Sequence, residues 1–310
     1  MNIITSLDTI EAPTVIALGN FDGIHRGHRR VIDPVLASRK GIPTVVSFHP
    51  HPREWFSGQR RTLLTPLDEK SEYLAAIGVQ QLVMLSFNKK LASLSPKDFV
   101  EHVLIQQLNA QWISVGQNFK FGYQRSGNTN DLKAIAASHH VHVNIAELQR
   151  CGDERISSSG IREALSQGDV ERANQLLGRP YQLRGTVSYG QQLGRTLGFP
   201  TANLNIQEHK FCPRHGVYYV SVGCSDESTI SQPIPGVMNI GTRPTVDGTQ
   251  TTIEVHLLDW KGDIYDQTLQ VQLKRFLRPE QKFESLSALK EQITADCNVV
   301  RSLIHSSSVI

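Results

Sequence analysis

The pattern of apolar and polar residues in this sequence changes near Gly178-Arg179-Pro180. Before it, short apolar, β-rich runs alternate with longer helical patterns, as in a parallel sheet joined by right-handed crossovers. After it, β-rich stretches follow one another with Gly, Pro, Asp and Asn turns between them, which predicts an antiparallel sheet or barrel. One hydrophobic core rarely organises 310 residues. We therefore expect two domains, residues 1–182 and 183–310.

The expected elements follow from the periodicity within each part. Buried strands of the first domain are predicted at 14–21, 42–48, 81–87 and 112–116, and helices at 95–108, 132–139, 157–165 and 169–177. β-rich stretches of the second part are predicted at 181–190, 216–224, 233–241, 251–259 and 267–278, with a terminal helix at 287–304. The fold class is α/β with a parallel sheet, followed by an all-β domain that ends in a helix.

The composition is that of an ordinary globular protein, and it limits the kinds of ligand. The four cysteines, Cys151, Cys212, Cys224 and Cys297, are far apart and form no CxxC pair, so neither a disulfide framework nor a structural zinc site is expected. The chain shows neither a basic signal-peptide region nor about 18 uninterrupted apolar residues. Its 32 basic and 29 acidic residues are well mixed, which argues against nucleic acid. We expect a cytoplasmic protein with small-molecule ligands and no membrane partner.

A glycine- and histidine-containing segment directly follows the first predicted strand and opens a helix. His25 and His28 are three residues apart and would share one helix face, while Gly23 and Gly27 let a phosphate approach the backbone. The N-terminus of a helix favours an anion, and two imidazoles there can stabilise charge that develops on a phosphate. A metal-binding pair is an alternative, although no third ligand is nearby and an i, i+4 spacing suits that role better.

A serine-rich turn, Ser157 to Ser159, precedes another predicted helix that carries Arg162. Consecutive hydroxyl and N–H groups before a helix can form an anion nest, and an arginine can fork onto a phosphate. The alternative is a simple helix N-cap.

The second domain contains no P-loop and none of the protein-kinase motifs. Its most informative segment begins with a glycine-flanked stretch that contains Gly190, Gly194 and Arg195, and it continues to Thr201 and Asn203. In an extended segment Thr201 and Asn203 point to one face. Their oxygens, together with phosphate oxygens, are the ligands that Mg²⁺ prefers, although a solvated polar stripe would look the same.

A carboxylate in the middle of a later strand suits general-base chemistry. Glu254 alternates with the apolar residues Ile253 and Val255, so it can face a ligand while they pack on the opposite side. Considered alone, a glutamate in this position is more often a solvent-facing strand residue.

Together these segments resemble the bacterial bifunctional riboflavin kinase/FAD synthetases. The His-x-Gly-His motif resembles that of the nucleotidyltransferase superfamily, and the amino-terminal resemblance extends to residues 47–56, 115–128 and 156–165. The segment GFPTANL at 198–204 resembles the riboflavin kinase signature, and residues 216–222, 235–248 and 252–278 follow in that family's order. The resemblance extends from about residue 12 to residue 303.

The resemblance implies a Rossmann-like nucleotidyltransferase domain with a parallel sheet, followed by an antiparallel β-barrel riboflavin kinase domain with a C-terminal helix. It implies phosphorylation of riboflavin to FMN by ATP, then adenylylation of FMN to FAD with release of pyrophosphate, both with Mg²⁺. The implied ATP site of the adenylyltransferase comprises Asn20, Asp22, Gly23, His25, His28, Asn118, Ser157, Ser158, Ser159 and Arg162. His25 and His28 are its implied catalytic residues. The implied ATP site of the kinase comprises Gly190, Gly194, Arg195, Thr201 and Asn203, with Thr201 and Asn203 at the metal and Glu254 as the base.

Two departures from the family pattern and two rival interpretations accompany this assignment. Asn118 stands where the family often has Asp, and Ser159 where Thr is more usual; both keep hydrogen-bonding ability. One rival keeps the fold with a single active domain. The other is a nucleic-acid-binding, synthetase-like protein, against which stand the absence of a KMSK-like lysine loop and of a basic run interleaved with aromatics. The sequence leaves the oligomeric state open.

Overall fold

The computed structural model describes residues 1–189, 198–225, 229–245 and 248–307. By their contacts these residues fall into two compact units, Met1–Ser158 and Ser159–Ile310. Within the described ranges, no helix combines the length and the apolar character that crossing a membrane requires.

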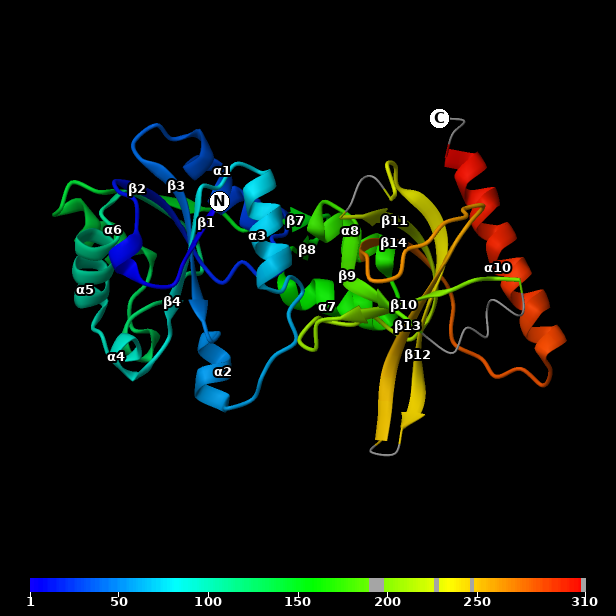
Figure 1. Cartoon of the computed structure of the whole chain (residues 1–310). Coiled ribbons are helices and arrows are strands. Elements are labelled where there is room, and N and C mark those ends of the chain that lie inside the picture. The colour runs from blue at the N-terminus through cyan, green and yellow to red at the C-terminus, as the bar shows by residue number, and fades with distance from the viewer. Residues whose placement is uncertain (190–197, 226–228, 246–247, 308–310) are drawn as a thin grey trace. The chain divides into compact units, whose positions relative to one another are not determined.

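The first unit contains a six-stranded sheet in which neighbouring strands are parallel (Figure 1). Its strands are β1 (Asn2–Ile4), β2 (Thr14–Leu18), β3 (Ile42–His49), β4 (Gln81–Ser86), β5 (Ala110–Gly116) and β6 (His142–Ala146), in the order β1-β4-β3-β2-β5-β6. The parallel sheet predicted from the alternating pattern is confirmed. The sequence pattern did not predict β1 and β6, which are the two edge strands of the sheet.

Helices cover both faces of this sheet (Figure 1). The helices of this unit are α1 (Arg26–Ala37), α2 (Pro52–Ser57), α3 (Leu67–Ala76), α4 (Lys89–Ala92), α5 (Pro96–Asp98), the π-helix η2 (Phe99–Gln107) and α6 (Thr129–Ala137). The unit also contains two short 3₁₀ helices, η1 (Leu7–Thr9) and η3 (Tyr123–Arg125), and a hairpin of β7 (Arg150–Cys151) and β8 (Glu154–Arg155). Along β2, Val15 and Ala17 pack on the side of α1 and α3, whereas Ile16 and Leu18 pack on the side of η2 and α6. After Thr14 the strand is apolar, because both of its faces are buried.

The strand order places a topological switch beside β2. The chain passes from β2 to β3 and β4 on one side and later crosses to β5 on the other side. In open parallel sheets, ligands bind outside the carboxyl ends of the strands at such a point. The turn after β2 and the loop after β5 are therefore the expected place for a ligand.

The second unit is built on a closed antiparallel barrel with the strand order β10-β13-β12-β11-β14-β9. Its strands are β9 (Tyr181–Ser188), β10 (Ala202–Ile206), β11 (Gly216–Cys224), β12 (Ile234–Thr245), β13 (Gly248–Leu257) and β14 (Thr268–Arg278). Five of them are the predicted stretches, and β10 is the extended segment that carries Asn203. Alternate residues such as Leu183, Tyr218, Met238 and Val271 are fully buried and fill the interior.

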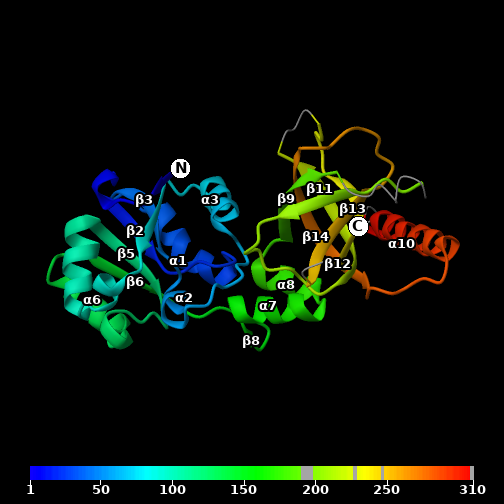
Figure 2. The same cartoon turned by 60° about the horizontal axis from the view of Figure 1, so that its bottom comes forward.

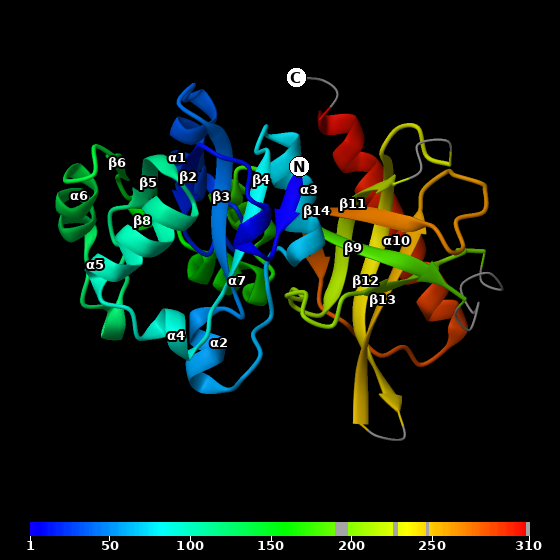
Figure 3. The same cartoon turned by 60° about the vertical axis from the view of Figure 1, so that its left-hand side comes forward.

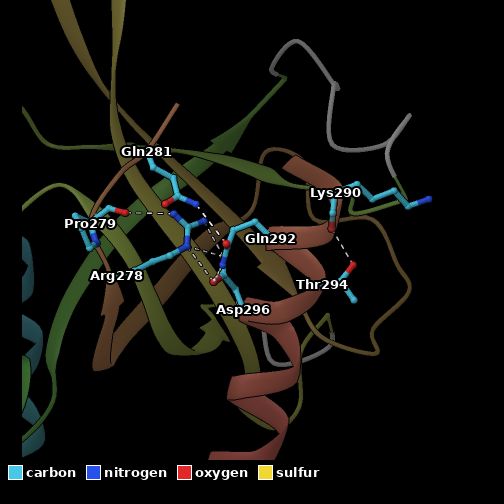
Figure 4. A network of polar contacts seen from close by, with 7 residues as sticks. All are labelled: Arg278, Pro279, Gln281, Lys290, Gln292, Thr294 and Asp296. Carbon is cyan, nitrogen blue, oxygen red and sulfur yellow. Dashed lines mark hydrogen bonds and ion pairs between the residues drawn. The ribbon is translucent and has the colours of Figure 1, made fainter. Parts of the chain in front are cut away.

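The predicted terminal helix is α10 (Leu286–Ser307), which packs against β12 on the outside of the barrel (Figures 2 and 3). Its residues Cys297 and Val300 join Val217 and Val237 in an apolar cluster. At the end of β14, Nη2 of Arg278 lies 2.8 Å from Oδ2 of Asp296 on α10, and the Arg278 Nε lies 3.0 Å from Oδ1 (Figure 4). This bidentate pair ties the helix to the barrel.

Two helices that precede the barrel in sequence pack with it. They are α7 (Ser158–Gln167) and α8 (Val170–Leu177), and α8 contacts β9 and β14. The Asn174 side chain donates to the Leu273 carbonyl at 2.9 Å and accepts from the Tyr181 N–H at 2.7 Å. The change of pattern near residue 182 marks the first barrel strand, but the contacts extend the second compact unit back to Ser159. Whether 182 bounds the two activities stays a prediction.

The packing of α8 predicts that a fragment of residues 159–310 is more stable than a fragment of residues 183–310. The shorter fragment lacks the buried residues Leu176, Leu177 and Tyr181 and should lose about 3–5 kcal/mol of unfolding free energy. Urea unfolding followed through Trp260 fluorescence measures the difference. Equal midpoints would show that α7 and α8 do not belong to the folding unit of the barrel.

Candidate functional site

The turn between β2 and α1 has an unusual backbone that the core holds in place. Phe21, Gly23 and Ile24 have positive φ angles of 48°, 93° and 40°. For residues other than glycine this conformation costs roughly 1–3 kcal/mol each. The side chains of Phe21 and Ile24 are fully buried in the core that contains α1. Apolar burial therefore fixes the shape of the turn.

The two histidines of this turn lie against each other. His25 is the N-cap of α1, and its Nδ1 accepts from the His28 N–H at 3.2 Å. The two imidazole rings are stacked with centroids 3.6 Å apart and an angle of 14° between their planes. A Cβ on Gly27 would lie 3.2 Å from the His25 ring, so a glycine at this position leaves room for the stack. The predicted pairing of His25 and His28 on one side of the helix start is present in the structure.

Two other segments, one just before α3 and one at the start of α7, hold the same turn. Oδ1 of the buried Asp22 accepts from the Thr65 N–H at 3.2 Å, and the Thr65 hydroxyl accepts from the Gly23 N–H at 2.9 Å. The Ser158 hydroxyl donates to the Asp22 carbonyl at 2.7 Å. Ser158 therefore joins the turn, and its part in binding ATP stays a prediction. Thr65 was missed, and only its place just before α3 could have drawn attention to it.

The other predicted members of this site lie in different parts of the chain. Asn118 is exposed in the loop after β5, and a Cβ on Gly116 would lie 3.4 Å from its Oδ1. Ser159 and Arg162 lie on α7 in the second unit, where the Arg162 guanidinium lies 5.7 Å from the centre of the Phe211 ring. The structure thus gathers Asn20, Asp22, Gly23, His25, His28 and Ser158 at the turn, and the assignment of Asn118, Ser157, Ser159 and Arg162 to the same pocket stays a prediction.

On the barrel, the strand register aligns four polar residues, Ser188, Asn203, Glu254 and Asn239, which we call the polar row. Asn203 on β10 is paired with Ser188 on β9 and with Glu254 on β13, and Glu254 is paired with Asn239 on β12. Directly paired residues of neighbouring strands point to the same face, with Cβ atoms about 4.5–5.5 Å apart. The row lies on the outer face, because neighbouring residues such as Ile253 and Val255 are buried inside the barrel.

Contacts at the start of β10 fix the position of Thr201. Nδ1 of His256, two residues after Glu254, lies 2.9 Å from the Pro200 carbonyl oxygen. The Phe199 ring packs edge-on against the His256 ring, with centroids 5.4 Å apart. Thr201 lies between Pro200, whose carbonyl meets His256, and Ala202, which pairs with Val255 on β13. The structure therefore brings the predicted residues Thr201, Asn203 and Glu254 to one region.

Two residues beside Glu254 were not predicted from the sequence. Asn239 pairs with Glu254 in register, and Gly241 follows two residues later on β12. A Cβ on Gly241 would overlap the carboxylate of Glu280 and lie 3.2 Å from the Asn239 amide nitrogen. The carboxylate of Glu280 therefore lies close to the backbone of Gly241, beside the polar row. Asn239 meets Glu254 only through the exact register of the β12–β13 hairpin, and Glu280 lies beyond β14, so no short motif signals them.

The predicted residues Gly190, Gly194 and Arg195 lie in the segment 190–197, outside the described residues.

A further histidine, His51, lies near the first-unit turn and was not predicted. It caps α2, where its Nδ1 accepts from the Arg53 N–H at 3.0 Å. Burial, together with the positive charge of Arg61, lowers the pKa of His51 from 6.5 to about 4. At neutral pH the ring is therefore uncharged, which its role as acceptor requires.

Two family models match separate parts of the chain. The FAD synthetase model matches residues 7–160, and the riboflavin kinase model matches residues 177–304. The first range contains the turn at residues 20–28 with His25 and His28, which we call the histidine turn, and the second contains the polar row. They define the class of protein as one that joins an FAD synthetase module to a riboflavin kinase module.

Relatives match nearly the whole chain. The bifunctional riboflavin kinase/FMN adenylyltransferase of Pseudomonas fluorescens is 40% identical over 298 residues, covering 95% of this chain and 94% of that protein. The protein of the same name from Escherichia coli K12 is 38% identical over 286 residues, covering 91% and 90%. A crystal structure from Streptococcus pneumoniae, described as a macrolide-efflux protein, is similar with a TM-score of 0.85 and 30% identity, covering 96% and 98%. The chain belongs to the bifunctional riboflavin kinase/FMN adenylyltransferase family.

The half-buried, neutral state of His51 predicts a stability that depends on pH. Because the pKa is lowered in the folded state to about 4, the unfolded chain takes up the proton first as pH falls below 6.5. The contribution of His51 is therefore complete above pH 6.5 and is lost as pH falls toward 4. His51→Asn keeps a capping acceptor that does not titrate, so its thermal midpoint should decline less across this window. Thermal unfolding of both proteins, with the exposed His102→Asn as control, measures this. Parallel declines would contradict the assignment.

Proposed function

We propose that this chain performs two consecutive reactions at separate sites. At the polar row of the barrel, riboflavin and ATP give FMN and ADP. At the histidine turn of the first unit, FMN and ATP give FAD and pyrophosphate. Family membership over nearly the whole chain supports both activities, and the proposal assigns each activity to named residues.

In the kinase reaction, Glu254 accepts the proton of the ribityl 5′-hydroxyl as that oxygen attacks the γ-phosphorus of ATP. The bond from this phosphorus to the bridging oxygen breaks, and ADP leaves. Asn203 and Asn239 flank Glu254 in register and would orient its carboxylate or the ribityl hydroxyls. The single observation that carries this assignment is the in-register pairing of Asn203 with Glu254.

The residues beside Glu254 suit Mg²⁺ that enters with ATP. The Thr201 hydroxyl and the Asn203 amide oxygen are hard oxygen donors of the kind that Mg²⁺ takes together with phosphate oxygens. Among the described residues, no group of three or more His, Cys, Asp or Glu side chains could hold a metal by itself. When bound, Mg²⁺ would neutralise charge on the transferred phosphoryl group.

In the adenylyl transfer, an FMN phosphate oxygen attacks the α-phosphorus of ATP, and the bond to the β-phosphate oxygen breaks to release pyrophosphate. His25 and His28 would donate to the phosphate oxygens on which charge develops. The strained turn and the helix start hold these donors before the substrate arrives. No covalent enzyme intermediate is required, because positioning and charge stabilisation suffice for an in-line attack.

We also place the enzyme in the cytoplasm, and we propose that both units are active. The four cysteines are free thiols, which fits a reducing compartment. The histidine pair and the polar row each retain the residue types that their chemistry needs, which favours two activities over a single active domain.

His28→Ala should abolish FAD formation while FMN formation persists. Losing one transition-state donor typically lowers the rate about 10²- to 10³-fold. The two sites lie in different compact units, so the kinase should be unaffected. Chromatographic separation of the flavins formed from riboflavin, or from added FMN, measures both reactions, with His102→Ala as the matched control. A folded variant that stopped making FMN would show that the two sites are not independent.

Glu254→Gln should lower kinase turnover by about 10²- to 10⁴-fold with little change in the KM for ATP, because the amide keeps the shape but not the basicity. Thr201→Ala should instead raise the KM for Mg-ATP, since it removes an oxygen donor. FMN adenylylation reports folding, and the exposed Glu284→Gln is the control. Phosphorylation of riboflavin by Glu254→Gln at the parent rate would mean that Glu254 does not take the proton.

A further inference from the structure

A buried lysine lies behind the histidine turn and has no part in the chemistry described above. Lys70 belongs to α3, and its side chain extends into the core beside the turn, where it is only 7% exposed. Its Nζ donates to the Asn20 carbonyl at 2.9 Å. The Ser47 hydroxyl donates to the same carbonyl at 3.2 Å. Two donors from different elements thus hold one backbone oxygen at the end of β2.

Burial of a lysine at this depth is unusual and needs a compensating interaction. A lysine ammonium has three hydrogens, and within the described residues Lys70 makes this one hydrogen bond. An ammonium group is costly to remove from water unless it is paired or hydrogen-bonded. Packing alone would favour methionine at this position, because its unbranched side chain fills most of the same space without a charge.

The charge of Lys70 has a counterpart in the turn itself. Asp22 is 7% exposed, and its carboxylate would oppose a polyphosphate at the site. Burial lowers the pKa of Lys70 below its usual value, and the Asp22 carboxylate opposes this shift in part. The negative charge of Asp22 therefore favours the charged form of Lys70, and a protonated Lys70 offsets the repulsion that Asp22 would exert on an anion.

We propose that Lys70 is a positioning residue of the adenylyltransferase site, whose ammonium fixes the Asn20 carbonyl and offsets the Asp22 carboxylate so that the turn accepts the triphosphate of ATP. The inference rests on the proposed phosphate site at residues 20–28. It adds a group on α3 that acts through the turn and does not itself touch the substrate.

Three substitutions separate the hydrogen bond, the charge and the packing of Lys70. Lys70→Met keeps the apolar stem and removes both polar functions. Lys70→Gln keeps a donor but no charge, and Lys70→Arg keeps both. The exposed Lys133→Met on α6, whose buried residues belong to the core on the other face of the sheet, is the matched control.

The readout is FAD formation from added FMN in the full-length protein, at varied ATP and varied FMN. Lys70→Met and Lys70→Gln should lower kcat/KM for ATP about 10- to 100-fold, since a small displacement of the turn misplaces its donors. The KM for FMN and riboflavin phosphorylation should stay within about two-fold of the parent, and Lys70→Arg should recover part of the loss.

Several outcomes would overturn this inference. Lys70→Met with parent kcat/KM for ATP would mean that Lys70 only fills space, and Lys70→Arg no better than Lys70→Met would remove the role of the charge. If Lys70→Met fails to fold by thermal unfolding, Lys70→Gln decides by the same readout. If His28→Ala keeps full FAD formation, the phosphate site itself is misplaced. If His28→Ala loses FAD formation and Lys70→Met does not, only the role of Lys70 fails.

Discussion

Backbone hydrogen bonding between strands determines where the functional side chains of this chain lie. In the barrel, the register of β10, β13 and β12 sets Asn203 and Asn239 on either side of Glu254. A shift of one residue in any of these strands would turn its polar residue into the apolar interior. The interior residues, such as Val255 and Met238, therefore specify the site as strongly as the polar residues do.

The first unit uses a different constraint to the same end. Its sheet is covered on both faces, so the polar groups that can meet a ligand are concentrated in the loops at the strand ends. The buried side chains of Phe21 and Ile24 anchor the turn after β2 in the core, and hydrogen bonds from this turn to Thr65 and from Lys70 to the Asn20 carbonyl hold it in place. Donors that are fixed in advance cost no reorganisation during the reaction, which suits charge stabilisation at phosphorus.

Much of this arrangement could be predicted from the sequence, because it depends on local pattern. Alternation of apolar runs and helical patterns predicted the parallel sheet, and the glycine and histidine spacing predicted the turn. The places of Asn239, Glu280 and Lys70 could not be predicted. Asn239 depends on the exact register of the β12–β13 hairpin, and Glu280 and Lys70 depend on contacts between segments that are distant in the sequence. The packing of α8 on the barrel is a similar case, since Asn174 connects it to two strands.

The two sites should act independently and in sequence, with FMN as the product of one and the substrate of the other. A mixture of the His28→Ala and Glu254→Gln proteins measures this independence, because each variant retains the site that the other has lost. With riboflavin, ATP and Mg²⁺, the mixture should form FAD, whereas His28→Ala alone should stop at FMN and Glu254→Gln alone should leave riboflavin nearly unchanged. A mixture that forms no more FAD than the two proteins do separately would show that the sites do not work independently with FMN between them.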